Sequence, residues 1–151
     1  MNLDATLAAL HYICIIMLVV FLSSEAVLCK PEYMSATTIR RLGKYDLLYF
    51  GFAMAALATG LARVYWGVKG AAFYSGNVFF WAKVTTFALI GLLSLPPTLA
   101  FMRWRKQFKA CASAQPSADE VMTVRRWILW EAHVLILLPV FAALMARGFG
   151  R

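Results

Sequence analysis

The stretch NVFFWAKVTTFALIGLLSLPPTLAFM, residues 77–102, decides the fold, because Lys83 is its only charged residue. About 20 consecutive apolar residues in a helix cross the hydrocarbon core of a bilayer, which is roughly 30 Å thick. A basic run, RWRK at 103–106, follows directly. The stretch therefore predicts a membrane-spanning helix that ends at a membrane surface.

Three other apolar segments have the same character, and together the four use most of the 151 residues. The chain is 62% hydrophobic and only 15% charged, and its mean hydropathy is +0.71. This balance is far from that of a soluble domain. The sequence predicts an all-α integral membrane four-helix bundle, a single four-pass transmembrane domain over residues 1–151, with helices at about 5–28, 47–64, 78–102 and 127–146.

The positions of the basic residues predict the orientation. Ten of the fifteen Lys and Arg lie in the first connection (residues 29–46) and the third connection (residues 103–126). The second connection (residues 65–77) and residues 1–6 are poor in them. Because cytoplasmic loops carry the excess of Lys and Arg, both termini should lie on the outer (periplasmic) side of a bacterial inner membrane. The net charge of +8 then indicates topology and attraction to anionic membrane lipids. No module suited to nucleic acid is found in the loops.

Four ionisable residues inside apolar segments are candidate functional groups, because such groups are rare in hydrocarbon. At 1.5 Å per residue, His11 and Lys83 should each lie about 9 Å outward of the bilayer centre, and Arg63 slightly further out. His133 should lie about 5 Å inward. A haem held between the two histidines is therefore not expected, whereas His11, Arg63 and Lys83 share one level.

Each of these residues has an alternative role that is only structural. Lys83 is close enough to the outer boundary for its ammonium group to reach the lipid headgroups, and Arg63 can anchor a helix end. His133 can serve as an interhelical hydrogen-bonding group. The inner acidic residues can pair with neighbouring cations; these acids are Glu25, Asp46 and Glu131, and the cations are Lys30, Lys44, Arg125 and Arg126.

The chain resembles a bacterial family of predicted four-pass membrane proteins of unknown function. Three segments carry the resemblance, and they are LHYICIIMLVVF at 10–21, RRLGKYDLLYFGFAMAALATGLARVYW at 40–66 and NVFFWAKVTTFALIGLLSLPPTLAFMRWR at 77–105. The resemblance extends over nearly the whole chain and implies no particular activity.

A more distant resemblance is to the HemJ-type protoporphyrinogen oxidases, which are small haem-binding membrane proteins of bacteria. It rests on the early histidine of the first helix and on the W-x-K pattern of Trp81 and Lys83. The resemblance implies that His11 is the haem ligand and that Lys83 is the essential lysine. That family has an arginine one turn before the lysine, where this chain has Phe79, so Arg63 of the neighbouring helix is the expected substitute.

Two classes of function follow. In the first, the protein binds haem b through the metal ligand His11, and Lys83 and Arg63 act as catalytic groups that hold the carboxylates of haem or of a porphyrin or quinone ligand. Its reaction would be porphyrinogen oxidation with membrane quinone as electron acceptor. In the second, the protein is a non-enzymatic membrane component, either a transporter or channel built as a homo-oligomer or an accessory subunit.

Overall fold

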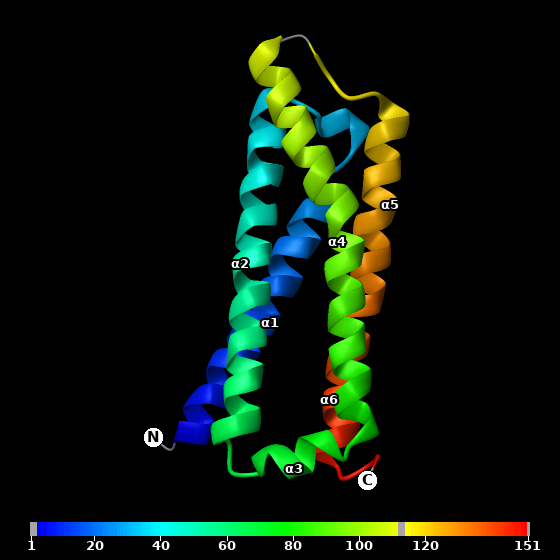
Figure 1. Cartoon of the computed structure of the whole chain (residues 1–151). Helices are drawn as coiled ribbons and strands as arrows, with labels where there is room; N and C mark the ends of the chain where they lie inside the picture. The colour runs from blue at the N-terminus through cyan, green and yellow to red at the C-terminus, as the bar shows by residue number, and fades with distance from the viewer. Residues whose placement is uncertain (1–2, 112–113, 151) are drawn as a thin grey trace.

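The computed structural model describes residues 3–111 and 114–150, and every regular element in these ranges is helical. Figure 1 shows the elongated arrangement of the helices. The elements are α1 (Leu3–Leu28), the short 3₁₀ helix η1 (Pro31–Tyr33), α2 (Ala36–Trp66), α3 (Gly70–Ser75), α4 (Val78–Ala110), α5 (Ala118–Leu135) and α6 (Leu137–Ala146).

Four helical stretches are long and apolar enough to cross a membrane, which confirms the predicted fold class. They are α1, α2, α4 and the continuous pair α5 and α6. Many large apolar side chains on them are exposed, among them Ile16, Phe50, Leu92 and Leu99. Lipid chains are the natural surroundings for such a surface, because helices satisfy their own backbone groups in hydrocarbon.

Three of the helices extend beyond the predicted bounds at the basic end of the bundle. α2 begins at Ala36 instead of residue 47, α4 continues to Ala110 instead of 102, and the last span begins at Ala118 instead of 127. Ser35 and Ser117 cap the two early starts by accepting hydrogen bonds from the Thr38 and Glu120 amides. Hydropathy predicted the apolar part of each helix but missed these polar helical extensions, where many of the cations lie.

Proline has different effects in the last two spans. α4 continues through Pro96 and Pro97, so these residues do not end the helix, and Figure 1 shows that α4 changes direction along its length. In the last span the helix is interrupted at Ile136, three residues before Pro139. A proline lacks the amide donor that the preceding turn needs, which explains why the helix is interrupted just before Pro139.

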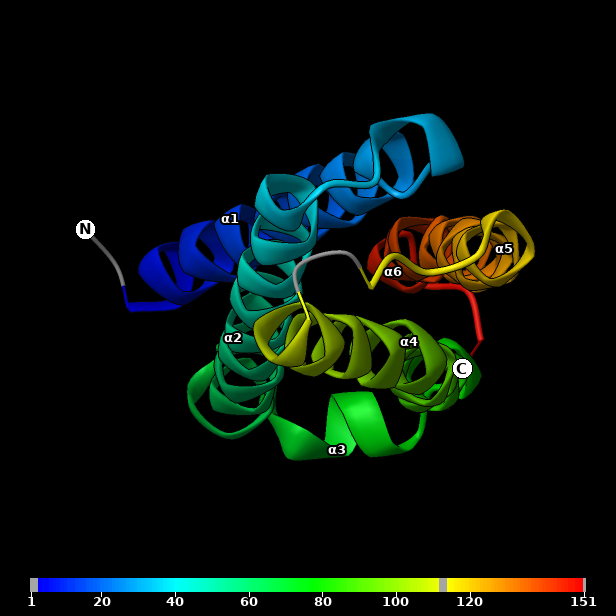
Figure 2. The same ribbon diagram turned by 90° about the horizontal axis from the view of Figure 1, so that it is seen from above.

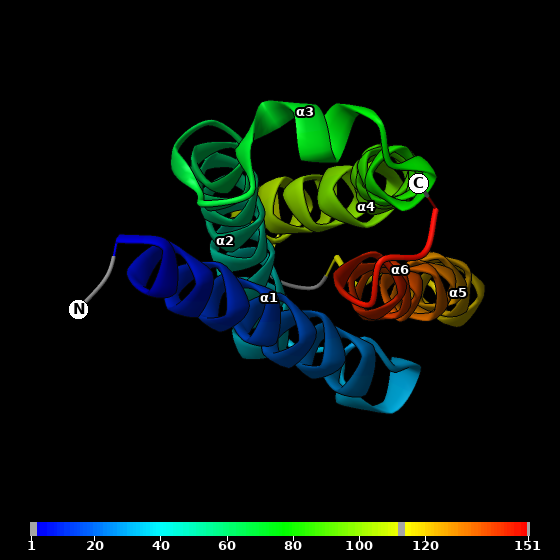
Figure 3. The ribbon, with the colours of Figure 1, turned by 90° about the horizontal axis from the view of Figure 1, so that it is seen from below.

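The bundle has two differently packed ends. Following the predicted orientation, we call the end with α3 the outer end and the end with η1 the inner end (Figure 1). Figures 2 and 3 show α1 crossing α2, and α4 beside α5 and α6, with α3 bridging α2 and α4. Most of the fully buried large side chains lie in the inner half, and they include Leu22, Ile39, Leu42, Phe101, Trp104 and Ile128.

The start of α1, α3 and the end of α6 lie at one end in Figure 1. This arrangement brings the first and last described residues to the same end as the second connection. The side of the membrane that this end faces stays a prediction from the positive charges.

Candidate functional site

His11 of α1 is held against α2 by a hydrogen bond. Its Nδ1 lies 3.0 Å from the hydroxyl oxygen of Thr59, and that hydroxyl donates to the Ala55 carbonyl at 2.7 Å. Because the hydroxyl proton is used there, the Thr59 oxygen is the acceptor and His11 Nδ1 is the donor. The neutral ring then presents Nε2 with a lone pair, which is the form that ligates a metal.

Gly60 allows this close approach of the two helices. A Cβ atom at this position would lie only 3.2 Å from His11 Cε1. Ala56 and Gly60, one turn apart on α2, therefore leave room for the imidazole ring as well as for close helix packing. His11 is partly buried as a result.

Arg63 of α2 and Lys83 of α4 lie near His11. The charges of both act on the imidazole, and the Arg63 charge also acts on Lys83. Both side chains are partly buried, and Arg63 Nε is buried without a hydrogen-bond partner in the described residues. We call His11, Thr59, Arg63 and Lys83 the outer polar site.

The outer polar site brings together the three residues that the depth argument had placed at one level. Two cations beside a neutral imidazole attract an anionic ligand, and an unused guanidinium N–H is available to a carboxylate. Phe79, at the position of the arginine in the HemJ-type pattern, instead lies against Phe141 of α6 with ring centroids 6.0 Å apart.

His133 does not belong to this site. It is exposed, and its Nδ1 lies 2.6 Å from the Leu129 carbonyl of the same helix. The expectation of an interhelical hydrogen bond was therefore wrong. Glu131, two positions earlier, is only 1% exposed, so the two residues lie on different sides of their helix.

The inner acids, which the sequence places together toward the inner face, form a second group whose burial was not predicted. Glu25 of α1 is 2% exposed, and Glu25, Asp46 and Glu131 lie within electrostatic range of one another. The Tyr49 hydroxyl of α2 faces the same group. We call Glu25, Asp46, Tyr49 and Glu131 the acid cluster.

The expected pairing of these acids with neighbouring cations was wrong. In the described ranges the ion pair present is Arg103 with Glu120, while Asp46 accepts a hydrogen bond of 2.6 Å from Thr98 of α4. Arg125 instead donates to the backbone carbonyls of Ala26 and Cys29. Sequence proximity suggested ion pairs, but Glu25 and Glu131 are buried and Arg125 binds backbone carbonyls of α1 instead.

A signal for the acid cluster was present in the sequence. Glu25 follows the buried Leu18 and Leu22 at helical spacing, and Glu131 follows Val124 and Ile128 in the same way. An acidic residue that continues the apolar stripe of a helix faces the core of the bundle. The spacing therefore carried more information than the nearby charges.

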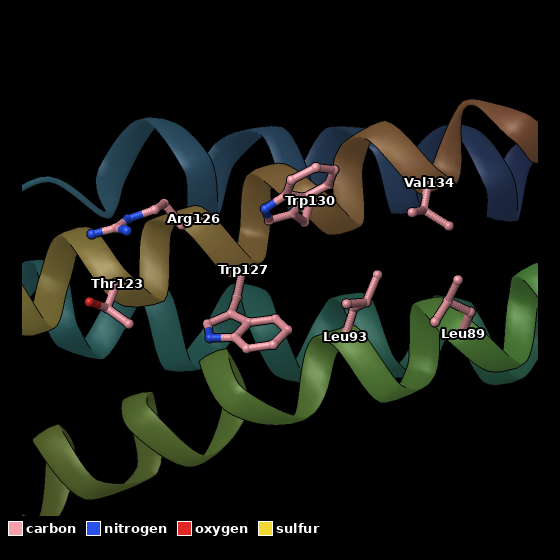
Figure 4. Close-up of a pocket in the computed structure, with 7 residues that line it drawn as sticks. All are labelled: Leu89, Leu93, Thr123, Arg126, Trp127, Trp130 and Val134. Carbon is pink, nitrogen blue, oxygen red and sulfur yellow. The ribbon is translucent and has the colours of Figure 1, made fainter.

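An apolar groove lies between α4 and α5 on the surface of the bundle. Figure 4 shows Trp127 directed from α5 toward α4, with Leu89 and Leu93 directed back from α4. Arg126 and Thr123 line the same groove. The outer polar site does not contribute to it.

These features define a class, an all-α membrane protein with four apolar spans and ionisable groups inside its bundle. Within that class, the chain belongs to the family described as "Predicted membrane protein (DUF2214)", whose family model matches residues 3–150. This match confirms the resemblance to a family of predicted membrane proteins of unknown function, and the description names no activity. No curated protein matches the chain, and no solved structure does.

Proposed function

We propose that the protein is a haem b-binding redox protein of the membrane, with His11 as an axial ligand and a porphyrinogen or quinol as its substrate. The observation that supports this proposal is the convergence of His11, Arg63 and Lys83 from three helices. When bound, haem b supplies one-electron redox chemistry.

The residues of the outer polar site have separate roles in this proposal. Thr59 accepts the Nδ1 proton of His11 and thereby keeps Nε2 available for iron. Arg63 and Lys83 hold carboxylates, either the haem propionates or those of a porphyrin substrate. Such contacts are strong here because the site is partly removed from water.

The HemJ-type resemblance suggests protoporphyrinogen oxidation as the specific reaction, with electrons passed to membrane quinone. In that reaction Lys83 is a catalytic residue, and Arg63 takes the place of the arginine that Phe79 replaces. A localisation in the bacterial inner membrane, where quinone is available, is part of the same proposal.

The test is the absorption spectrum of the detergent-purified protein expressed with ample haem supply. We expect a Soret band that is lost in His11→Ala and retained in His133→Ala, because only the first substitution removes the iron bond. The two variants each remove one imidazole and are matched in this respect. A colourless wild-type protein, or equal loss in both variants, would refute haem ligation by His11.

The groove between α4 and α5 favours a second candidate, a non-enzymatic component that associates with a second copy or with another membrane helix. Its lining is mostly apolar, with two tryptophans at helical spacing, Trp127 and Trp130. Light scattering of the purified protein, corrected for detergent, gives its oligomeric state. A monomer that carries haem would support the redox function, whereas a colourless oligomer would support this second candidate.

A further inference from the structure

The acid cluster lies in the best-packed part of the bundle. Its side chains come from α1, α2 and α5, and Thr98 of α4 contacts Asp46. Glu25, Tyr49 and Glu131 are 2%, 5% and 1% exposed. Ionisable groups at such depth are expensive to bury, and they mark ion or proton pathways when they face a bundle interior.

Two carboxyl oxygens of the cluster, Glu25 Oε1 and Glu131 Oε1, have no hydrogen-bond partner in the described part of the chain. The Tyr49 hydroxyl forms no hydrogen bond of ordinary geometry, but it lies close enough to the Glu131 carboxyl group to interact with it. A buried polar atom without a partner costs about 1–3 kcal/mol. The Tyr49 hydroxyl therefore lies among carboxyl groups that keep unused hydrogen-bonding capacity.

In residues 3–111 and 114–150, none of these acids forms an ion pair with a lysine or arginine. Arg125 of α5 donates instead to the backbone carbonyls at the end of α1. Arg103 pairs with Glu120, and the Arg105 side chain lies over Gly43 of α2. The three acids therefore face one another without compensation, and they cannot all be ionised at once in a low-dielectric interior.

A proton fits this site better than a metal ion. In residues 3–111 and 114–150 no group of three His, Cys, Asp or Glu side chains is arranged to hold a metal ion. Tyr49 can instead connect the acids, because a phenol donates one hydrogen bond while it accepts another.

We propose that Glu25, Tyr49 and Glu131 form an intramembrane proton-exchange site in the inner half of the bundle. A proton leaves the carboxyl oxygen of one glutamic acid for the Tyr49 hydroxyl oxygen as the Tyr49 proton passes to the carboxylate of the other. One O–H bond forms for each that breaks, and no electrons are transferred. Asp46, held by Thr98, sets the negative field around the site. This proposal does not depend on haem at His11.

Carbodiimide labelling of the full-length protein in detergent tests the proposal. Dicyclohexylcarbodiimide adds to a protonated carboxyl group in an apolar environment, and mass spectrometry locates the adduct. We expect adducts on Glu25 or Glu131 at a yield more than about tenfold above that on Glu120, which is ionised and paired with Arg103. Glu25→Gln and Glu131→Gln should each remove their own adduct, while Glu120→Gln leaves the labelling unchanged.

Competition with salts distinguishes a proton from a metal cation. Labelling that persists in sodium, potassium or magnesium chloride and declines as the pH rises supports the proton site. Labelling that any of these salts blocks would overturn it in favour of a cation site. Absence of adducts at Glu25 and Glu131 in the wild-type protein would also overturn it, and this measurement requires no variant to fold.

Discussion

The inner and outer halves of the bundle differ in how their polar side chains are buried and hydrogen-bonded. In the inner half, side chains pack closely, and Glu25 and Glu131 are buried with unsatisfied oxygens. In the outer half, His11 is more exposed but has a partner in Thr59, with Arg63 and Lys83 nearby. Close packing isolates charge, whereas looser packing leaves charge available to a ligand. Each of the following experiments breaks or sharpens this contrast.

The largest expected effect is in thiol reactivity at the inner end. Burial raises the pKa of the Cys29 thiol to about 12, although the nearby Arg125 acts in the opposite direction. Relative to its reference value of 9.0, this shift reduces the thiolate fraction near neutral pH by about a thousandfold. We expect a maleimide to label the exposed Cys111 rapidly and Cys29 only after denaturation.

The same reaction tests the orientation. A membrane-impermeant maleimide should reach Cys111 in inside-out vesicles and not in spheroplasts. Cys111 follows the basic end of α4, which is predicted to face the cytoplasm. Labelling from the opposite side would refute the orientation, and rapid labelling of Cys29 in the folded protein would contradict the close packing of the inner end.

Trp104→Ala should cause the largest loss of stability. Trp104 is fully buried in α4, and its indole donates to the Glu120 carboxylate at 2.8 Å. We expect the free energy of unfolding in detergent to fall by about 3 kcal/mol, because a large cavity remains. Trp81→Ala is the matched control, since Trp81 is 55% exposed in the outer half and its indole donates one hydrogen bond, to the Ser75 carbonyl at 3.0 Å. Its effect should stay within about 1 kcal/mol. Equal losses would show that the two halves are packed alike.

Glu25→Met should stabilise the protein, in contrast to most core substitutions. Methionine has a similar shape and removes an unsatisfied buried carboxyl group, so we expect the free energy of unfolding to rise by about 1–3 kcal/mol. Asp46→Ala should lower it by a similar amount, because Asp46 accepts the hydrogen bond from Thr98. Thermal unfolding of both variants provides the measurement. Destabilisation by Glu25→Met would mean that Glu25 has a partner.

The smallest effect is expected at Gly60. Alanine favours a helix by about 1 kcal/mol over glycine, but the added Cβ would lie 3.2 Å from the His11 ring. Gly60→Ala should therefore be less stabilising than Gly51→Ala, whose Cβ meets nothing within 4 Å. We expect a difference of about 0.5–1 kcal/mol between the two variants in thermal unfolding. If both variants gain equally, the imidazole does not pack against Gly60.

Hydropathy and helix geometry predicted the four spans and the common level of His11, Arg63 and Lys83. These features depend on rise per residue and on the cost of charge in lipid, both of which act locally along one helix. The acid cluster could not be predicted from charge proximity, because Glu25 and Glu131 are 106 positions apart and meet only through packing of α1 against α5. The helix extensions at the inner end were missed because hydropathy detects only apolar residues. Polar residues continue a helix beyond the hydrocarbon core without giving that signal.

The bridge from Arg125 to the end of α1 has a consequence for biosynthesis. The Ala26 and Cys29 carbonyls receive their donor from a residue about a hundred positions later. A nascent chain that has inserted α1 and α2 but not yet α5 leaves these carbonyls and Glu25 without their final neighbours. The last span therefore completes the first one, and a chain that ends before residue 118 would hold three spans in which Glu25 and the end of α1 lack their partners from α5.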